Sequence, residues 1–198
     1  MRRQVISVLI WVATSSLASG QGASFGIKAG LNLAKLSTSL SATGLSSQND
    51  TPDTYVSFSA GVFGVIKLGD KFGFQPELLY SGQGGDLGVG SFRLNYLNLP
   101  VMFRFSPTPE FSLQAGPQLG ILLSAEISGI DIKDQFNTTD FGFGFGLGYE
   151  FPIKVDIGFR YVVGLLNIFN ADVSSSGLPS LTMTMNNQVL QFSVGHRF

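Results

Sequence analysis

The sequence predicts an all-β protein: an eight-stranded antiparallel up-and-down transmembrane β-barrel with short periplasmic turns and long extracellular loops. Three observations predict this fold. Large apolar residues alternate with small or polar ones in repeated segments, the connections between these segments alternate between short and long, and the N-terminus resembles an export signal. Alternation is the side-chain period of a β-strand, and about ten tilted residues cross a bilayer.

The clearest segment covers residues 141–151, where every odd position is large and apolar and every even position is Gly or Glu. Gly is unfavourable on a solvated strand face, because it adds an entropic cost and no packing. A small barrel explains the pattern, since its narrow interior accommodates small residues and an aromatic exterior suits lipid. We therefore expect the Gly face to point into the lumen.

The N-terminal segment has the three regions of a secretory signal peptide. Arg2 and Arg3 precede an apolar run over residues 5–13, and Ala18-Ser19-Gly20 forms a small-x-small cleavage site. The apolar run is too short to span a bilayer. We predict a signal peptide over residues 1–20 and a mature barrel domain over 21–198. The chain has no Cys, which excludes a lipoprotein anchor, disulfides and thiolate metal sites.

Composition narrows the class of protein further. Cleavage would lower Lys+Arg from 12 to 10 against 13 acids, a net charge of about −3, so nucleic-acid binding is not indicated. Charged residues make up 13% of the chain, about half the share in an average soluble domain. No second apolar run is long enough for a spanning helix. An apolar exported chain without such a helix favours a transmembrane barrel.

The expected strands each place apolar residues on one face. In chain order they cover residues 25–33, 56–68, 72–80, 94–105, 111–123, 141–151, 155–165 and 190–198. Within the third strand, Pro76 cannot donate a ladder hydrogen bond, which predicts a bulge or a missing bond there.

The lengths of the connections independently support the count of eight strands. The short turns are expected at residues 69–71, 106–110 and 151–152. The long loops, rich in Ser, Asn, Asp or Gly, are expected at about 37–53, 82–90, 126–138 and 167–180. This alternation is typical of periplasmic turns and extracellular loops, and an even strand number leaves both termini in the periplasm.

Several segments resemble the small outer-membrane β-barrel proteins of Bacteroidota, which are often labelled porin-family or PorT-like. The matching segments are GIKAGLN at 26–32, QPELLYS at 75–81, YLNLP at 96–100, AGPQLG at 115–120 and the terminal Phe198. This sequence has Asn98 and Arg104 where many relatives have an acid or Lys. The resemblance implies the fold and an outer-membrane location, whereas most members have no assigned biochemical role.

The residues usually associated with catalysis or metal binding have simpler interpretations. The only His, His196, lies in the apolar register near the C-terminus and has no evident catalytic partner. The loop acids Asp50, Asp53, Asp131 and Asp134 are too sparse for the six to eight oxygens that calcium prefers. The Gly series within 142–146 is spaced by two and precedes no helix, unlike a dinucleotide fingerprint. We expect no enzyme activity, no cofactor and no metal.

The inward-facing charged residues are more informative. The lumen charge network is predicted to contain Lys28, Glu77, Arg104, Glu150, Asp156, Arg160 and Arg197. Unpaired charges would be costly in so narrow an interior, so a paired network that plugs the barrel is expected. The last strand is predicted to carry an assembly signal in Phe192, Val194 and Phe198.

The leading hypothesis is a non-enzymatic outer-membrane protein that anchors surface loops, for envelope structure or adhesion. Its partners would be outer-membrane lipid, the barrel insertion machinery and periplasmic chaperones during assembly, and a further protein at the extracellular loops. The main alternative is a narrow porin-like transport protein or an accessory component of an outer-membrane secretion or uptake system. A third hypothesis is a barrel enzyme that acts on lipids, but this sequence offers no lumenal His and no acid–base–nucleophile set. A soluble lipocalin-like barrel would need a polar exterior, whereas this one is predicted to carry Phe and Leu.

Overall fold

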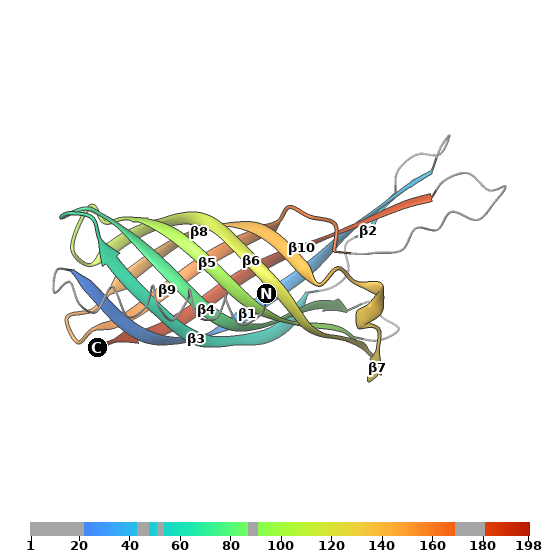
Figure 1. The fold of residues 1–198 in the computed structure, drawn as a ribbon, viewed down its shortest axis with the longest axis horizontal. Helices are drawn as coiled ribbons and strands as arrows, with labels where there is room; N and C mark the ends of the chain where they lie inside the picture. The colour runs from blue at the N-terminus through green and yellow to red at the C-terminus, as the bar shows by residue number, and fades with distance from the viewer. Residues whose placement is uncertain (1–21, 43–47, 51–53, 87–90, 169–180) are drawn as a thin grey trace, which may run out of the picture.

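The computed structural model describes residues 22–42, 48–50, 54–86, 91–168 and 181–198. Eight long strands make up most of the described chain (Figure 1). They are β1 (Ala23–Ala42), β3 (Tyr55–Lys67), β4 (Phe72–Asp86), β5 (Ser91–Phe105), β6 (Phe111–Ile127), β8 (Thr139–Glu150), β9 (Val155–Gly164) and β10 (Leu181–Arg197). The short strand β2 (Gln48–Asp50) pairs with β1, β7 (Ile130–Asp131) pairs with β6, and a 3₁₀ turn, η1, covers Lys133–Gln135.

The long strands form a closed antiparallel barrel. Each pairs with the next long strand in the chain, and β10 also pairs with β1 from Gly26↔Arg197 to Ala42↔Leu181. Closure leaves no free sheet edge around the wall, as a barrel in a bilayer requires. The predicted eight-stranded up-and-down barrel is therefore confirmed.

The two faces of the wall differ as the alternation predicted. Large apolar side chains cover the outside, and Phe145 and Leu31 are more than half exposed. Polar side chains such as Gln75 and Asn32 are almost completely buried inside. The glycines of β8 share this inward register, which leaves room for side chains from the opposite wall.

Several strands are longer than the sequence indicated. Part of the expected loop 37–53 belongs to β1 and β2, and part of the expected loop 82–90 belongs to β4. The expected loop 126–138 contains β7 and η1, and the last strand begins at Leu181 rather than near residue 190. Most of these segments are rich in small or polar residues, so apolar alternation is weak in their sequence. Backbone pairing nevertheless extends through them, and β1 and β10 keep one register to their ends. Figure 1 shows β1 and β10 running past the rest of the barrel.

Pro76 interrupts its ladder without forming a bulge. The β3–β4 pairing stops at Phe63↔Glu77 and resumes in the same register at Ile66↔Phe74. A register shift occurs instead between β5 and β6, at Asn95/Tyr96.

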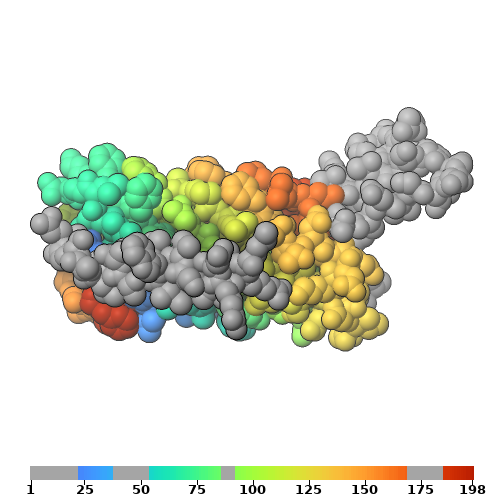
Figure 2. Space-filling view, in the orientation of Figure 1, coloured from blue at the N-terminus to red at the C-terminus, as the bar shows by residue number. Residues whose placement is uncertain are grey.

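The connections divide the barrel into two ends. Three short connections, at residues 68–71, 106–110 and 151–154, lie at the same end as the C-terminal Phe198, and we call this the short-turn end. The gold segment between β6 and β8 gathers at the opposite, long-loop end (Figure 2). The predicted signal peptide lies outside the described residues. Among the described residues, no helix has the length and apolar character needed to cross a membrane.

Candidate functional site: the barrel lumen

Glu77 lies at the centre of the lumen, and its side chain has no exposed surface. Arg160 of β9 donates from Nη2 to Glu77 Oε1 at 2.6 Å and from Nη1 to Oε2 at 2.8 Å. Lys28 of β1 places Nζ 3.0 Å from Glu77 Oε1. One carboxylate on β4 thus pairs with cations from two other strands, and we call these three residues the central cluster.

A second ion cluster lies nearer the short-turn end. Glu150, the last residue of β8, pairs with Arg197 through Oε1, and its Oε2 lies 3.7 Å from Nη2 of Arg104. All three side chains are largely buried. We call Arg104, Glu150 and Arg197 the lower cluster.

Gln75 connects the two clusters. Its amide oxygen accepts a hydrogen bond from Arg104 Nη1 at 3.0 Å, and its Nε2 donates to Glu77 Oε1 at 2.6 Å. Gln114 adds a further acceptor for Arg160 Nη2 at 3.0 Å. Such charge-assisted hydrogen bonds offset part of the cost of removing charges from water.

Asp156 differs from the other six predicted network residues. It makes no ion pair within the described ranges, and its buried Oδ1 has no hydrogen-bond partner there. Its carboxylate instead packs against Gly195, where a Cβ atom would collide with it. The structure therefore brings six of the seven residues into two clusters and leaves Asp156 beside them.

A layer of uncharged polar side chains lies above the central cluster, toward the long-loop end. Asn32 donates to Ser81 Oγ and to the backbone oxygen of Gly82, both at 2.9 Å. Gln191 donates to Asn32 Oδ1 at 3.1 Å and to Ser59 Oγ at 2.9 Å. We call Asn32, Ser59, Ser81 and Gln191 the amide layer, and its members satisfy one another across four strands.

Beyond the amide layer most buried side chains are apolar, although Asn187 donates a hydrogen bond to Gln83 at this level. A buried cluster, here called the apolar cap, consists of Leu36, Phe92, Leu94, Tyr96, Leu122, Ala125, Phe136, Ile168 and Met185. Phe136, from the β6–β8 connection, packs edge-on against Phe92 with ring centroids 5.4 Å apart. Ile168 donates its backbone N–H to Met185 and accepts from Asn137, both at 2.9 Å. Two connections are thus hydrogen-bonded into the mouth of the barrel.

Neither the apolar cap nor the amide layer was predicted from the sequence. The amide layer carried a signal, because Asn32, Ser81 and Gln191 are polar residues in the inward register. The sequence signal for the apolar cap was weaker. Phe92, Leu94 and Tyr96 lie in the inward register of β5, whose outward face is apolar only from Leu97 onward, and Phe136 lies in an expected loop.

The residues predicted as an assembly signal face outward from β10. Phe192, Val194 and Phe198 are exposed, and Phe192 packs edge-on against Phe159 with centroids 5.0 Å apart. His196 is also exposed and contacts the Phe198 ring. Asp131 accepts a hydrogen bond from the backbone N–H of Lys133, whereas Asp53 lies outside the described residues. The described part of the chain contains no cluster of three metal-ligating residues.

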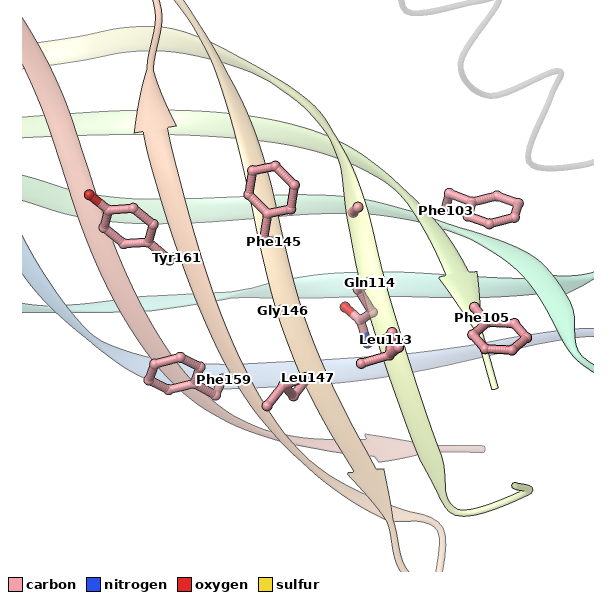
Figure 3. A pocket seen from close by; sticks show the side chains of 10 residues that line it. Phe103, Phe105, Leu113, Gln114, Phe145, Gly146, Leu147, Phe159 and Tyr161 are labelled. Carbon is pink, nitrogen blue, oxygen red and sulfur yellow. The ribbon is translucent and has the colours of Figure 1, made fainter. Parts of the chain in front are cut away.

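An apolar groove lies on the outer wall (Figure 3). Its volume is about 490 Å³, and large side chains flank the small residues Ala115 and Gly146. Phe103, Phe145 and Tyr161 contribute rings from three strands. The groove belongs to the surface that an outer wall of this composition presents to lipid, and it carries no charged residue.

A family profile and one similar solved structure agree with this fold. A family profile described as an outer membrane protein beta-barrel domain matches residues 15–170. Among solved structures, Neisserial surface protein A is similar with a TM-score of 0.56 and 17% identity, covering 90% of this chain and 100% of that one. OprG from Pseudomonas aeruginosa has a TM-score of 0.44 and 13% identity, covering 89% and 96%. Ail of Yersinia pestis has a TM-score of 0.43 and 13% identity, covering 86% and 98%. No curated protein matches the chain.

Proposed function

The chain belongs to the outer membrane protein beta-barrel domain family, and from this premise we propose that it is a non-enzymatic protein with a closed lumen that anchors its long loops at the cell surface. The barrel serves envelope structure or adhesion. The short-turn end faces the periplasm, and a signal peptide over residues 1–20 directs export. The segments at 75–81 and 96–100 support a PorT-like origin in Bacteroidota.

The observation that carries the proposal is that side chains fill the lumen at two levels. The central cluster joins β1, β4 and β9 across the interior, and the apolar cap fills the long-loop end. An eight-stranded barrel is just wide enough for side chains to fill it. Solute passage would require breaking buried ion pairs and displacing the apolar cap together.

Bilayer conductance tests the closed lumen. Purified protein in planar bilayers is expected to show no stable conductance steps. Large stable steps that disappear in Arg160→Ala, with folding stability unaltered, would overturn the closed lumen and favour transport. The matched control is Lys154→Ala, which removes an exposed cation at the short-turn end.

Surface anchoring has its own test. An epitope inserted after Gly129, whose surroundings are open, should be labelled by antibody on intact cells. The same epitope inserted after Gly69, in a short turn, should be labelled only after permeabilisation. The reverse pattern would place the long loops in the periplasm and contradict the proposal.

A narrow porin-like transport protein, or an accessory component of a secretion or uptake system, is the second candidate. One observation favours it: a cavity of about 10 Å³ lies inside the barrel beside Asp140 and Asn187. Asp140 Oδ1 and Asn187 Oδ1 are buried and have no partner among the described residues, so a water molecule fits there. A file of such waters would carry protons without large conductance steps. Proton flux into protein-containing vesicles, absent in Asp140→Asn, would support this candidate.

The partners follow from the proposed location. The apolar outer wall contacts outer-membrane lipid, and the outward residues of β10 interact with the insertion machinery and periplasmic chaperones during assembly. A further protein partner would bind at the long-loop end.

A further inference from the structure

A pocket of about 420 Å³ opens at the short-turn end of the lumen. The lower cluster forms its inner part, because Arg104, Glu150 and Arg197 all line it. Lys67 and the turn residues Asp70 and Lys71 line its outer part. We call this space the vestibule. It is separate from the cavity beside Asp140 and from the groove on the outer wall.

The vestibule has more cations than anions. Four cationic side chains line it, against two carboxylates. Glu150 is shared by both arginines, and neither Lys67 nor Lys71 makes an ion pair among the residues that the structure describes. Asp156 does not line the pocket but also attracts Arg104, so four cations face three carboxylates. The vestibule therefore keeps a net positive charge that attracts anions.

The donors are suited to an anion with several oxygens. A guanidinium has five N–H donors in a planar fork, more than Arg104 uses in its contacts with Gln75 and Glu150. Such forks match carboxylate and phosphate geometry, and each lysine adds a point charge with three donors.

Backbone hydrogen bonds define the conformation of the outer part of the vestibule. Leu68 donates its backbone N–H to Phe72 at 2.8 Å, and Ser106 donates to the backbone oxygen of Lys71 at 2.7 Å. Gly69 has φ +121°, a backbone conformation that residues with a side chain rarely adopt. Glycine at this position therefore allows the tight turn before Asp70. The backbone that carries Lys71 is thus fixed against the neighbouring β5–β6 connection.

We propose that the vestibule binds a compact polyanion bearing phosphate or carboxylate groups, which enters from the short-turn end. The lower cluster contacts the deep end of the anion, and Lys67 and Lys71 contact the outer end. The site does not depend on whether the lumen conducts, because the anion reaches it without passing the central cluster.

Calorimetric titration of the folded protein in zwitterionic detergent tests the proposal. Inorganic pyrophosphate and citrate are titrated separately at low ionic strength, because salt screens exposed charges. Saturable binding of either anion is expected. If only pyrophosphate binds, the ligand carries phosphate groups, and if only citrate binds, it carries carboxylates. Binding of both anions would show that the site recognises negative charge.

Matched lysine variants locate the binding. Lys67→Gln and Lys71→Gln should each weaken binding about tenfold, as expected for losing one charge-assisted hydrogen bond. Lys154→Gln removes an exposed lysine from the same end without changing the vestibule lining, and it should leave affinity unchanged. Equal affinity in all three variants, or no saturable binding by the wild-type protein, would overturn the proposal.

A second measurement avoids substitutions altogether. Amine acetylation of the wild-type protein, read by mass spectrometry, should slow at Lys67 and Lys71 when the bound anion is present, but not at Lys154. If the anion left the acetylation rate of each of the three lysines unchanged, the proposed site would be contradicted, even if calorimetry had detected binding heat.

Discussion

Arg160 and Glu77 form a two-pronged ion pair across the lumen, although 83 residues separate them in the chain. Both guanidinium terminal nitrogens reach a separate carboxylate oxygen, and the two side chains are almost completely buried. This geometry combines two charge-assisted hydrogen bonds with one ion pair. A buried charge that loses its partner is costly, so the pair makes the barrel sensitive to single substitutions in its interior.

Glu77→Gln should lower the free energy of unfolding by about 3–5 kcal/mol, because Lys28 and Arg160 would remain charged without their carboxylate. Urea unfolding in lipid vesicles, followed by gel mobility, measures this. Glu110→Gln, which removes an exposed acid in a short turn, should have little effect. The double variant Glu77→Gln/Arg160→Gln should cost less than the sum of its single variants. Strict additivity would show that the two charges do not interact.

Phe136→Ala should loosen the β6–β8 connection while the barrel stays folded. The wild-type ring packs against Phe92 in the apolar cap, and truncating a buried Phe costs about 3–5 kcal/mol of packing. Trypsin cleavage after Lys133, whose Nζ donates to Leu123 O at 2.9 Å, should therefore accelerate about tenfold or more. Ile130→Ala removes an exposed side chain and is the control. Unchanged cleavage would mean that the cap does not hold this connection.

Gly116→Ala and Gly144→Ala should differ, although the two residues pair directly across β6 and β8. A Cβ at Gly116 would collide with the backbone oxygen of Val101, which cannot move without parting two strands. A Cβ at Gly144 would meet side-chain atoms and no backbone atom within 3.6 Å: Met102 Cε lies 3.3 Å away, Arg160 Cδ 3.5 Å and Val162 Cγ2 3.6 Å. We expect Gly116→Ala to destabilise the barrel by about 1–3 kcal/mol. Equal unfolding curves for the two variants would show that the backbone contact at Gly116 does not restrict the residue at that position.

Deleting Phe198 should lower the amount of folded protein in the outer membrane. The ring lies exposed at the end of β10 and contacts His196, so it contributes little to the interior. Its expected role is recognition by the insertion machinery. Heat-modifiable gel mobility of envelope fractions measures folding, and Phe198→Tyr, which keeps an aromatic end, should assemble normally. If the protein that lacks Phe198 assembled fully, Phe198 would not be part of the assembly signal.

The mature protein should begin at Gln21. Because Trp11 is the only Trp in the chain, the cleaved protein should contain none. Intact mass and a fluorescence spectrum with tyrosine emission alone would agree with this cleavage. Indole emission from purified envelope protein would show that residue 11 is retained.

The sequence by itself determined the barrel. Strict alternation, as in residues 141–151, sets which side of a strand faces lipid, and this local period needs no knowledge of distant contacts. The same alternation placed Lys28, Glu77 and Arg160 in the inward register. Short turns such as 69–71 were also evident, because Gly and Asp mark them locally.

Only the tertiary structure decided which inward residues meet and where the lumen closes. Pairing depends on the stagger between strands, which a single strand does not encode. The link through Gln75 and the lack of an ion pair at Asp156 among the described residues therefore could not be derived from alternation. The apolar cap also escaped prediction. Phe136 comes from a connection without periodicity, and it is buried because the closed wall brings β5 and β10 around it.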